Sequence, residues 1–467
     1  MNVILITIDC LRADHLGCLG YDKKTTPTID SLAKEGFLFT QAISTGVPTS
    51  NSFPGILAST YPVYEVSKHH WRKLPKNATL ISEVLRKNGY TTAAFHSNPM
   101  LSRYYGYSRG FDIFDDSLLF KIIERRNKLQ NLAKKITRGH AKAYKLAAKI
   151  YWTGVKIKNL FQGYLSQDQP YERAEIITQK AISWLKNSCN KKFFLWLHYM
   201  DVHEPYLPPR EYLKNLKISK REQRKLWRKI LQQERNKNLA SKGISEDELK
   251  KIVDLYDAEL RYLDSNLKFF FDELKEMGVY DDTFIIITSD HGQEFMEHGW
   301  VGHRGKQKPY DTLIHVPLII KGPGLERNVV RKQVSLLDLS PTILDLLNLP
   351  KESRFLGKSF LPIIDEENSK GVISVGHDMG DAVRFISYRT PEWKLITDNK
   401  GKTYELYNLK KDPNETRNLY EEERDIAKEF ETKIKEHIRI ENIIEKTESE
   451  ITRMAEKLRK LKKLGKI

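Results

Sequence analysis

Residues 284–303 read FIIITSDHGQEFMEHGWVGH. The stretch opens with four bulky apolar residues, which is typical of a strand that is buried on both faces of a sheet. Asp290 and His291 follow where this strand is expected to end, and His298 and His303 come close behind. A carboxylate and an imidazole at a buried strand end are costly unless a cation or a hydrogen-bond donor meets them. The stretch therefore predicts a buried strand with a functional site at its carboxyl end.

Apolar runs of this kind alternate with amphipathic segments along the chain. Strands are expected at residues 3–8, 37–44, 91–98, 193–199, 284–290 and 316–322, and helices at residues 27–36, 51–59, 79–90, 174–188 and 255–278. This alternation predicts an α/β fold in which a mostly parallel central sheet lies between layers of helices. Functional sites in such sheets lie at the carboxyl ends of the strands. Because Asp9, Asp201 and Asp290 each follow a predicted strand, we expect them to converge.

The composition indicates a soluble globular protein. Of the 467 residues, 40% are hydrophobic and 30% are charged, a balance that can bury a large core. No apolar run approaches the roughly 18–20 residues that span a bilayer, and the N-terminus lacks the basic region and cleavage site of a signal peptide. The three cysteines form no Cys-x-x-Cys pair, which fits a reducing compartment. A cytoplasmic location is therefore expected.

Three regions are expected along the chain. A catalytic domain covers residues 1–370 and carries basic helical insertions at about 117–170 and 208–250. Short strands within residues 371–418 predict a small antiparallel sheet. The charged tail at 419–467 has apolar residues at helical spacing. It predicts either a coiled coil that pairs two copies of the chain or a helix packed against the body.

Two segments carry much of the net charge of +17. Residues 121–158 contain twelve Lys/Arg and one acid, and residues 210–251 contain fourteen Lys/Arg and six acids. Such segments bind an anionic membrane or a polyanion, or they are solvated faces of helices that pack on the body, and both alternatives stay open. Aromatic residues do not interleave with the basic runs, so sequence-specific nucleic-acid binding is not expected.

Asp9 ends the first apolar strand as Asp290 ends a later one. Taken alone, Asp9 has the simpler interpretation of a helix cap or a salt bridge with Arg12, and the Asp290–His291 pair that of a capped loop. Together, two carboxylates and an imidazole suit Mn²⁺ or Zn²⁺, or Mg²⁺ or Ca²⁺ in a more oxygen-rich site. Thr49 lies between a strand and a helix, where a hydroxyl is either an N-cap or, beside a cation, a nucleophile.

Several longer motifs occur in a fixed order along the chain. They are ITIDCLRADHLGCLGY (6–21), TSNSFPGILASTYP (49–62), LHYMDVHEPY (197–206), SDHGQEFMEHG (289–299) and YELYNLKKDPNETRNL (404–419). With these motifs the chain resembles the sulfatase branch of the alkaline phosphatase superfamily over roughly residues 2–420. The resemblance implies an alkaline phosphatase-like fold and a metal-dependent ester hydrolase. It also implies that Asp9, Asp290 and His291 bind the cation, and it leaves one or two cations open.

The resemblance places Thr49 in the position of the nucleophile, thirteen residues before Pro62. Formylglycine-dependent sulfatases carry Cys or Ser there, within Cys/Ser-x-Pro-Ser-Arg. The five residues 49–53 read TSNSF, so the modifiable cysteine and the arginine are both absent. Cys10 also stands where many sulfatases have a second metal-binding aspartate. These departures favour a member of the family that uses threonine directly, with Thr49 as both nucleophile and metal ligand.

Other positions take roles from the same resemblance. His203 would donate to an equatorial oxygen or protonate the leaving group, and His303 would contact the transferring anion or help to hold a second metal. Asn98 either faces the substrate or caps a turn, Arg12 binds the substrate or a carboxylate, and His298 is either functional or structural. Tyr206 and Trp71 either line a pocket or belong to the core.

The expected reaction is the hydrolysis or transfer of a phosphate or sulfate ester through a covalent threonine intermediate, on a small-molecule, lipid or sugar substrate. A phosphorus ester, including a phosphodiester, is favoured because a sulfated threonine lacks the elimination route of a formylglycine hydrate. One alternative is a sulfuric ester hydrolase of the arylsulfatase type. A second alternative is a head-group phosphotransferase that the basic segments hold at a membrane.

Overall fold

The computed structural model describes residues 1–62, 74–75, 77–116, 171–214, 216–235, 243–303, 305–361, 371–378 and 383–439. The expected basic insertion at 117–170, Trp71, and the part of the tail after residue 439 lie outside these ranges. Within them, no helix combines the length and the apolar character needed to cross a bilayer.

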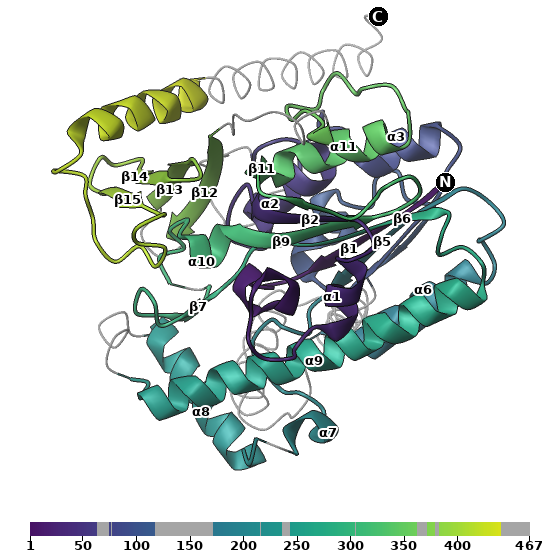
Figure 1. Cartoon of the computed structure of the whole chain (residues 1–467), viewed down its shortest axis with the longest axis horizontal. Coiled ribbons are helices and arrows are strands. Elements are labelled where there is room, and N and C mark those ends of the chain that lie inside the picture. Colours follow the sequence, from purple (N-terminus) through teal and green to yellow (C-terminus); the bar gives the residue numbers. More distant parts are fainter. Residues whose placement is uncertain are drawn as a thin grey trace, which may run out of the picture.

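A nine-stranded sheet crosses the body in the order β10-β2-β9-β6-β1-β5-β3-β4, with β11 paired to β2 (Figure 1). The strands are β1 (Asn2–Ile8), β2 (Phe37–Ile43), β3 (Thr91–His96), β4 (Ile113–Asp115), β5 (Phe193–Tyr199), β6 (Thr283–Ser289), β9 (His315–Lys321), β10 (Asn328–Val330) and β11 (Val334–Ser335). All paired strands are parallel except β9, which is antiparallel to both β2 and β6. The prediction of a mostly parallel sheet is confirmed.

The direction of β9 follows from its connection to β6. The helix α10 (Asp311–Ile314) ends immediately before β9 begins at His315. The two-stranded hairpin of β7 (Glu294–Phe295) and β8 (Val301–Gly302) precedes α10 in this connection. A parallel strand would need a crossover to the opposite edge of the sheet, usually a long helix. The chain instead re-enters the sheet after a short helix, and it runs antiparallel.

Helices cover both faces of the sheet, as Figure 1 shows. They include α1 (Pro27–Leu32), α2 (Thr49–Ala58), α3 (Ile81–Lys87), α6 (Ala174–Leu185), α9 (Glu246–Glu276) and α11 (Leu339–Leu346). Because side chains alternate along a strand, Ile4 and Ile6 of β1 pack with α1, α6 and α9, whereas Val3 and Leu5 pack with α2, α3 and α11. The two apolar clusters form the core on either side of the sheet.

Two helices begin earlier than the sequence predicts. The long helix α9 begins at Glu246, because the hydroxyl of Ser245 accepts from the backbone of Glu248 while the Glu248 side chain reaches back to the backbone of Ser245. This capping box satisfies two free N–H groups. The helix α2 begins at Thr49, after Pro48. Thr49 is therefore the first residue of a ten-residue helix and not part of the loop before it.

The second basic segment contains α7 (Arg210–Leu213) and α8 (Lys220–Arg235). Leu226 and Ile230 of α8 are buried in the same apolar cluster as α9. The ammonium of Lys229 also pairs with Glu248 near the start of α9. The apolar side of α8 therefore packs on the body. For this segment the structure shows one of the two expected alternatives, a helix that packs on the body through one face.

The expected small antiparallel sheet follows the central domain. It consists of β12 (Val372–Asp378), β13 (Val383–Arg389), β14 (Trp393–Asp398) and β15 (Tyr404–Asn408), in sequence order. A helix over residues 424–439 packs on it through Ala427, Phe430 and Ile434 (Figure 1). This part of the tail is a helix packed on the body, one of the two expected alternatives. Val375 of β12 bridges Gly46, just before α2.

Candidate active site and metal centre

Asp9 and Asp290 lie side by side because β1 and β6 are neighbouring parallel strands. Ile8 and Ser289 are paired in register, so the next residue of each strand carries a carboxylate at the same edge of the sheet. Both aspartates are fully buried, with no exposed side-chain surface. Two ionised carboxylates in this position require a compensating positive charge.

The first turn of α2 brings Thr49 to the same edge. Its Oγ1 lies 3.5 Å from Asp9 Oδ2 and 3.4 Å from His291 Nε2. His291 Nε2 in turn lies 3.6 Å from Asp290 Oδ2 and 4.0 Å from Asp9 Oδ1. The four residues that the sequence proposes as metal ligands thus lie around one point, although they come from distant parts of the chain.

The hydrogen bonds of His291 fix which ring nitrogen is available. Its Nδ1 lies 2.8 Å from the carbonyl oxygen of Gly292, which can only accept, so Nδ1 carries the proton. The lone pair of the neutral ring is therefore on Nε2, which faces Asp9, Thr49 and Asp290. A metal-binding histidine characteristically donates its other N–H in this way to a carbonyl or carboxylate.

The carboxylates have unused acceptor capacity. Asp290 Oδ1 accepts from the backbone N–H groups of Cys10 and His291, at 3.4 and 2.9 Å. Asp290 Oδ2 is buried and has no hydrogen-bond partner among the described residues. Burial and the adjacent Asp9 raise the pKa of Asp290. Burial also opposes ionisation of Asp9, but a hydrogen bond with His198 and the neighbouring imidazoles hold the pKa of Asp9 well below its usual value. A buried site with this donor set fits a divalent cation.

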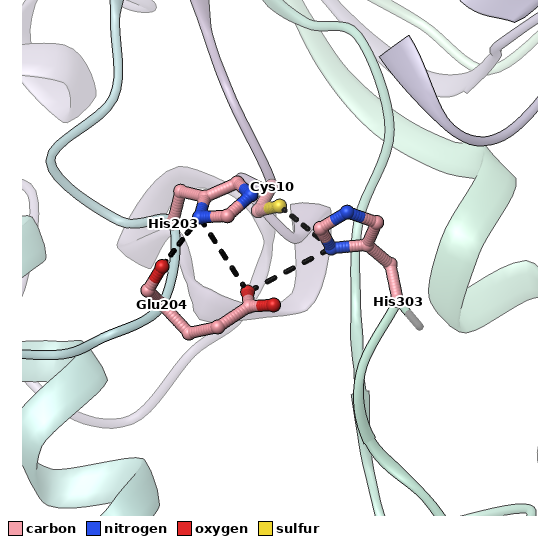
Figure 2. Close-up of side chains that lie close together, drawn as sticks. All are labelled: Cys10, His203, Glu204 and His303. Carbon is pink, nitrogen blue, oxygen red and sulfur yellow. Dashed lines mark hydrogen bonds and ion pairs between the residues drawn. The ribbon is translucent and has the colours of Figure 1, made fainter. Parts of the chain in front are cut away.

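A second group of side chains, drawn in Figure 2, lies beside the first, because Cys10 contacts Asp9 and His303 lies next to His291. It contains Cys10, His203, Glu204 and His303, whose donor atoms all lie within 4.8 Å of one another. Cys10 Sγ lies 3.4 Å from His303 Nδ1, and Glu204 Oε2 lies 3.7 Å from the same nitrogen. The rings of His291 and His303 are 4.7 Å apart. The structure therefore brings His203 and His303, the two proposed catalytic histidines, to the edge of the Asp9–Asp290 site.

Asn98 caps a turn, as one of the two expected alternatives has it, and it also binds Asp9. Its Nδ2 donates to Asp9 Oδ2 at 2.9 Å, and its Oδ1 accepts from the backbone N–H of Met100 at 2.9 Å. One end of the amide therefore orients a metal-binding carboxylate while the other end caps a turn. Asn98 reaches the site through Asp9.

Sequence reasoning missed two residues of the site. His198 is fully buried, with Nε2 3.4 Å from Asp9 Oδ2 and Nδ1 3.0 Å from Thr7 Oγ1. Its position in the apolar run 193–199 concealed it, although a polar residue near the carboxyl end of a buried strand was the available signal. Glu204, which is 1% exposed, directly follows His203 and was the second signal.

Four other candidate residues bind groups outside the Asp9–Asp290 site. The guanidinium of Arg12 pairs with Asp14 at 2.6 Å and with Glu297 at 2.5 Å, which is the expected carboxylate alternative. His298 Nδ1 lies 2.7 Å from Glu294 Oε1, and its ring stacks on Tyr310. Asp201 Oδ1 accepts from the backbone N–H of Ala174 at the start of α6. The hydroxyl of Tyr206 donates to the side chain of Gln293 within the core.

The family comparisons agree with this architecture. The family model described as Sulfatase matches residues 1–349. A second model, described as N-sulphoglucosamine sulphohydrolase, C-terminal, matches residues 296–442. The two matches together run from the first strand of the sheet into the helix that packs on the C-terminal sheet.

Individual proteins are similar along most of their length. Arylsulfatase K of Bos taurus is 24% identical over 453 residues, which cover 90% of this chain and 78% of that protein. An arylsulfatase of Clostridium perfringens is 24% identical over 453 residues and 90% of each chain. The structure of the phosphonate monoester hydrolase of Agrobacterium radiobacter has a TM-score of 0.68 and 20% identity, over 94% of this chain and 96% of that one, and at this identity the likeness shows the fold.

The Sulfatase model covers most of the chain, and the residues that it matches include the buried carboxylates, the imidazole and the hydroxyl described above. The chain therefore belongs to the sulfatase family and is a sulfatase-like ester hydrolase.

Proposed function

We propose that this chain hydrolyses a sulfate ester of a small molecule or sugar at the site formed by Asp9, Thr49, Asp290 and His291. The main observation that supports this proposal is that Thr49 Oγ1 lies within 3.5 Å of both Asp9 Oδ2 and His291 Nε2. The arylsulfatases among the relatives and the match to a sulphohydrolase model support a sulfate ester more than the phosphorus ester that the threonine favours in the sequence.

The residues would hold a divalent cation through the carboxylates of Asp9 and Asp290, Nε2 of His291 and Oγ1 of Thr49. Such a cation polarises the ester oxygens and lowers the pKa of a nearby hydroxyl. Two carboxylates with one imidazole and one hydroxyl form an oxygen-rich set, which admits Ca²⁺ and Mg²⁺ as well as Mn²⁺.

The chain itself orients the attacking oxygen. Asp9 Oδ2 accepts from the Thr49 hydroxyl and from Asn98 Nδ2, so the carboxylate is fixed while it directs the hydroxyl. Thr49 is the first residue of α2, where the free N–H groups and the helix dipole favour a bound anion. A sulfate ester placed there would present its central atom to Thr49 Oγ1.

The reaction would proceed in two displacements. Thr49 Oγ1 releases its proton to solvent water and forms a bond to sulfur, while the bond from sulfur to the ester oxygen breaks. The departing oxygen takes up a proton or is stabilised by a positive charge. We assign this role to the part of the site formed by His203 and His303. Water then attacks the sulfur, releases sulfate and restores the Thr49 hydroxyl.

A second candidate function is the hydrolysis or transfer of a phosphate, phosphodiester or phosphonate ester at the same site. The identity of Thr49 favours it, because threonine cannot be converted to formylglycine and a phosphorylated threonine is released by direct attack at phosphorus. The membrane head-group phosphotransferase is a special case of this candidate. The phosphotransferase stays a prediction, because the more basic insertion lies outside the described residues. The cytoplasmic location also stays a prediction.

A substrate panel separates the two candidates. The purified chain is assayed with an aryl sulfate, an aryl phosphate, an aryl phosphodiester and an aryl phosphonate that share one chromogenic leaving group. We expect kcat/KM to be highest for the sulfate. A kcat/KM for any phosphorus ester that exceeds the value for the sulfate would overturn the first candidate in favour of the second.

A further inference from the structure

The group of Cys10, His203, Glu204 and His303 adjoins the ligand set of Asp9 and Asp290, and Cys10, which also lies close to Asp9 and His291, belongs to both groups. Cys10 adopts a left-handed backbone with φ of +62°, which is uncommon for a residue other than glycine and concentrates at functional sites. The turn places Asp9 and Cys10 in neighbouring groups of side chains. Cys10 Sγ donates to Asp9 Oδ1 at 3.1 Å and also contacts His303. The chain thus holds a thiol where the first cation site ends.

Two of the distances between donor atoms match those of a small tetrahedral metal site. Zinc binds sulfur at about 2.3 Å and nitrogen or oxygen at about 2.0–2.2 Å, so its tetrahedral ligands lie roughly 3.3–3.7 Å apart. The Sγ of Cys10 lies 3.4 Å from Nδ1 of His303, and Oε2 of Glu204 lies 3.7 Å from that nitrogen. One ring nitrogen of His203 completes the group within 4.8 Å of the other three donors.

The orientation of His203 is also that of a ligand. Its Nδ1 lies 2.6 Å from the carbonyl oxygen of Glu204, so Nδ1 carries the proton and the lone pair of the neutral ring is on Nε2. Figure 2 draws Nε2 on the side of the ring that faces Cys10. The hydroxyl of Tyr171 donates to the backbone oxygen of His203 at 2.5 Å and fixes the segment that carries the ring.

The chemistry of the four side chains selects the kind of cation. A thiolate and two imidazoles favour zinc over the oxygen-seeking Mg²⁺ and Ca²⁺. With the thiolate of Cys10 and the carboxylate of Glu204 the set carries two negative charges, which one divalent cation neutralises. Cys10 and Glu204 are nearly fully buried, whereas the His203 side chain is 16% exposed, so the group can be reached from one side.

We propose that Cys10, His203, Glu204 and His303 bind a second divalent cation of the zinc class, next to the oxygen-rich site of Asp9, Asp290 and His291. Its role, which rests on the proposed function, is to supply the positive charge for the departing ester oxygen in place of a protonated imidazole. The binding itself is independent of the substrate. A failure to bind zinc and a failure to hydrolyse sulfate esters are therefore separate results.

The test loads the metal-free full chain with Co²⁺, which takes zinc sites and gives an intense near-ultraviolet charge-transfer band when a thiolate binds it. Cys18→Ser and Cys189→Ser are matched controls, since these cysteines lie outside the group. We expect the band in the wild type and in both controls, and its loss in Cys10→Ser. Elemental analysis after dialysis against Zn²⁺ should find one equivalent fewer in Cys10→Ser and in His303→Gln than in the wild type.

Two results would overturn the proposal. One is a cobalt-loaded wild type without a thiolate band, which would make the group a hydrogen-bonded network around a thiol. The other is a band or a zinc equivalent that survives Cys10→Ser. If the Cys10 variant fails to fold by circular dichroism, His303→Gln and the wild-type spectrum decide between the same outcomes.

Discussion

Asp290→Asn should raise the stability of the metal-free protein and reduce the stabilisation that a cation provides. The asparagine side chain has the same shape as the aspartate, and its Oδ1 can still accept from the backbone of Cys10 and His291. The substitution replaces Oδ2, a buried acceptor without a hydrogen-bond partner among the described residues, with an amide that can donate toward Asp9. It also removes one of two adjacent buried negative charges.

The magnitudes follow from these contacts. A buried polar group left unsatisfied costs about 1–3 kcal/mol, and more when it is charged, so metal-free Asp290→Asn should be more stable than the metal-free wild type by about 1–3 kcal/mol. A cation at a hundred times its Kd stabilises the wild type by about 2.7 kcal/mol. The variant has lost a charged ligand and should gain much less at the same cation concentration.

Urea denaturation of chelator-treated and Ca²⁺- or Mn²⁺-loaded protein measures both effects. Asp264→Asn is the matched control, because Asp264 is a buried carboxylate that accepts from the backbone of Thr28 and Ile29 outside the site. This control should respond to the cation like the wild type. The reasoning is refuted if metal-free Asp290→Asn is less stable than the wild type, or if the cation stabilises both proteins equally.

Three further predictions concern the surroundings of the site. Asn98→Ala should weaken cation binding about 10–100-fold, measured by calorimetric titration, because the donor to Asp9 is lost; unchanged affinity would leave Asn98 as a turn cap alone. Arg12→Ala should destabilise the fold by about 1–3 kcal/mol in urea denaturation and leave KM for the ester unchanged, because Arg12 pairs with Asp14 and Glu297; a raised KM would restore it as a substrate ligand. Burial raises the pKa of Asp264 to about 6, so the folded state holds a proton that the unfolded state releases near its usual value of 3.8. The contribution of Asp264 to stability should fall as pH rises from about 4 through about 6. The slope of the unfolding free energy against pH in this range should therefore be less negative in Asp264→Asn than in the wild type; equal slopes would contradict the burial argument.

The sequence predicted the parts of the site that strand ends determine. The apolar runs before Asp9 and Asp290 are long enough to identify β1 and β6, and neighbouring parallel strands must end at the same edge. This logic also placed His291 near them, whereas Thr49 came from the resemblance to the sulfatase family. The direction of β9 was not predictable, because it depends on how the chain after β6 returns to the sheet, and that path contains only short elements.

The residues that sequence reasoning missed, or included in the site although other partners hold them, depend on how the chain folds around each of them. Arg12 and His298 lie close to site residues in the chain, but Glu297 and Glu294 hold them, and only the path of the β7–β8 hairpin brings these acids within reach. His198 faces Asp9 because of its register with Thr7 in the neighbouring strand. A single sequence does not contain that register.

The most direct test of the central claim compares Thr49→Ala with Thr49→Ser in steady-state turnover of the best ester of the panel, after circular dichroism has established that both variants fold. If the hydroxyl at the start of α2 is the attacking group, kcat/KM should fall about 10³-fold or more in Thr49→Ala and remain within about tenfold of the wild type in Thr49→Ser, which keeps the hydroxyl. Turnover of Thr49→Ala within about tenfold of the wild type would contradict the account, because some other oxygen would then make the bond to the ester.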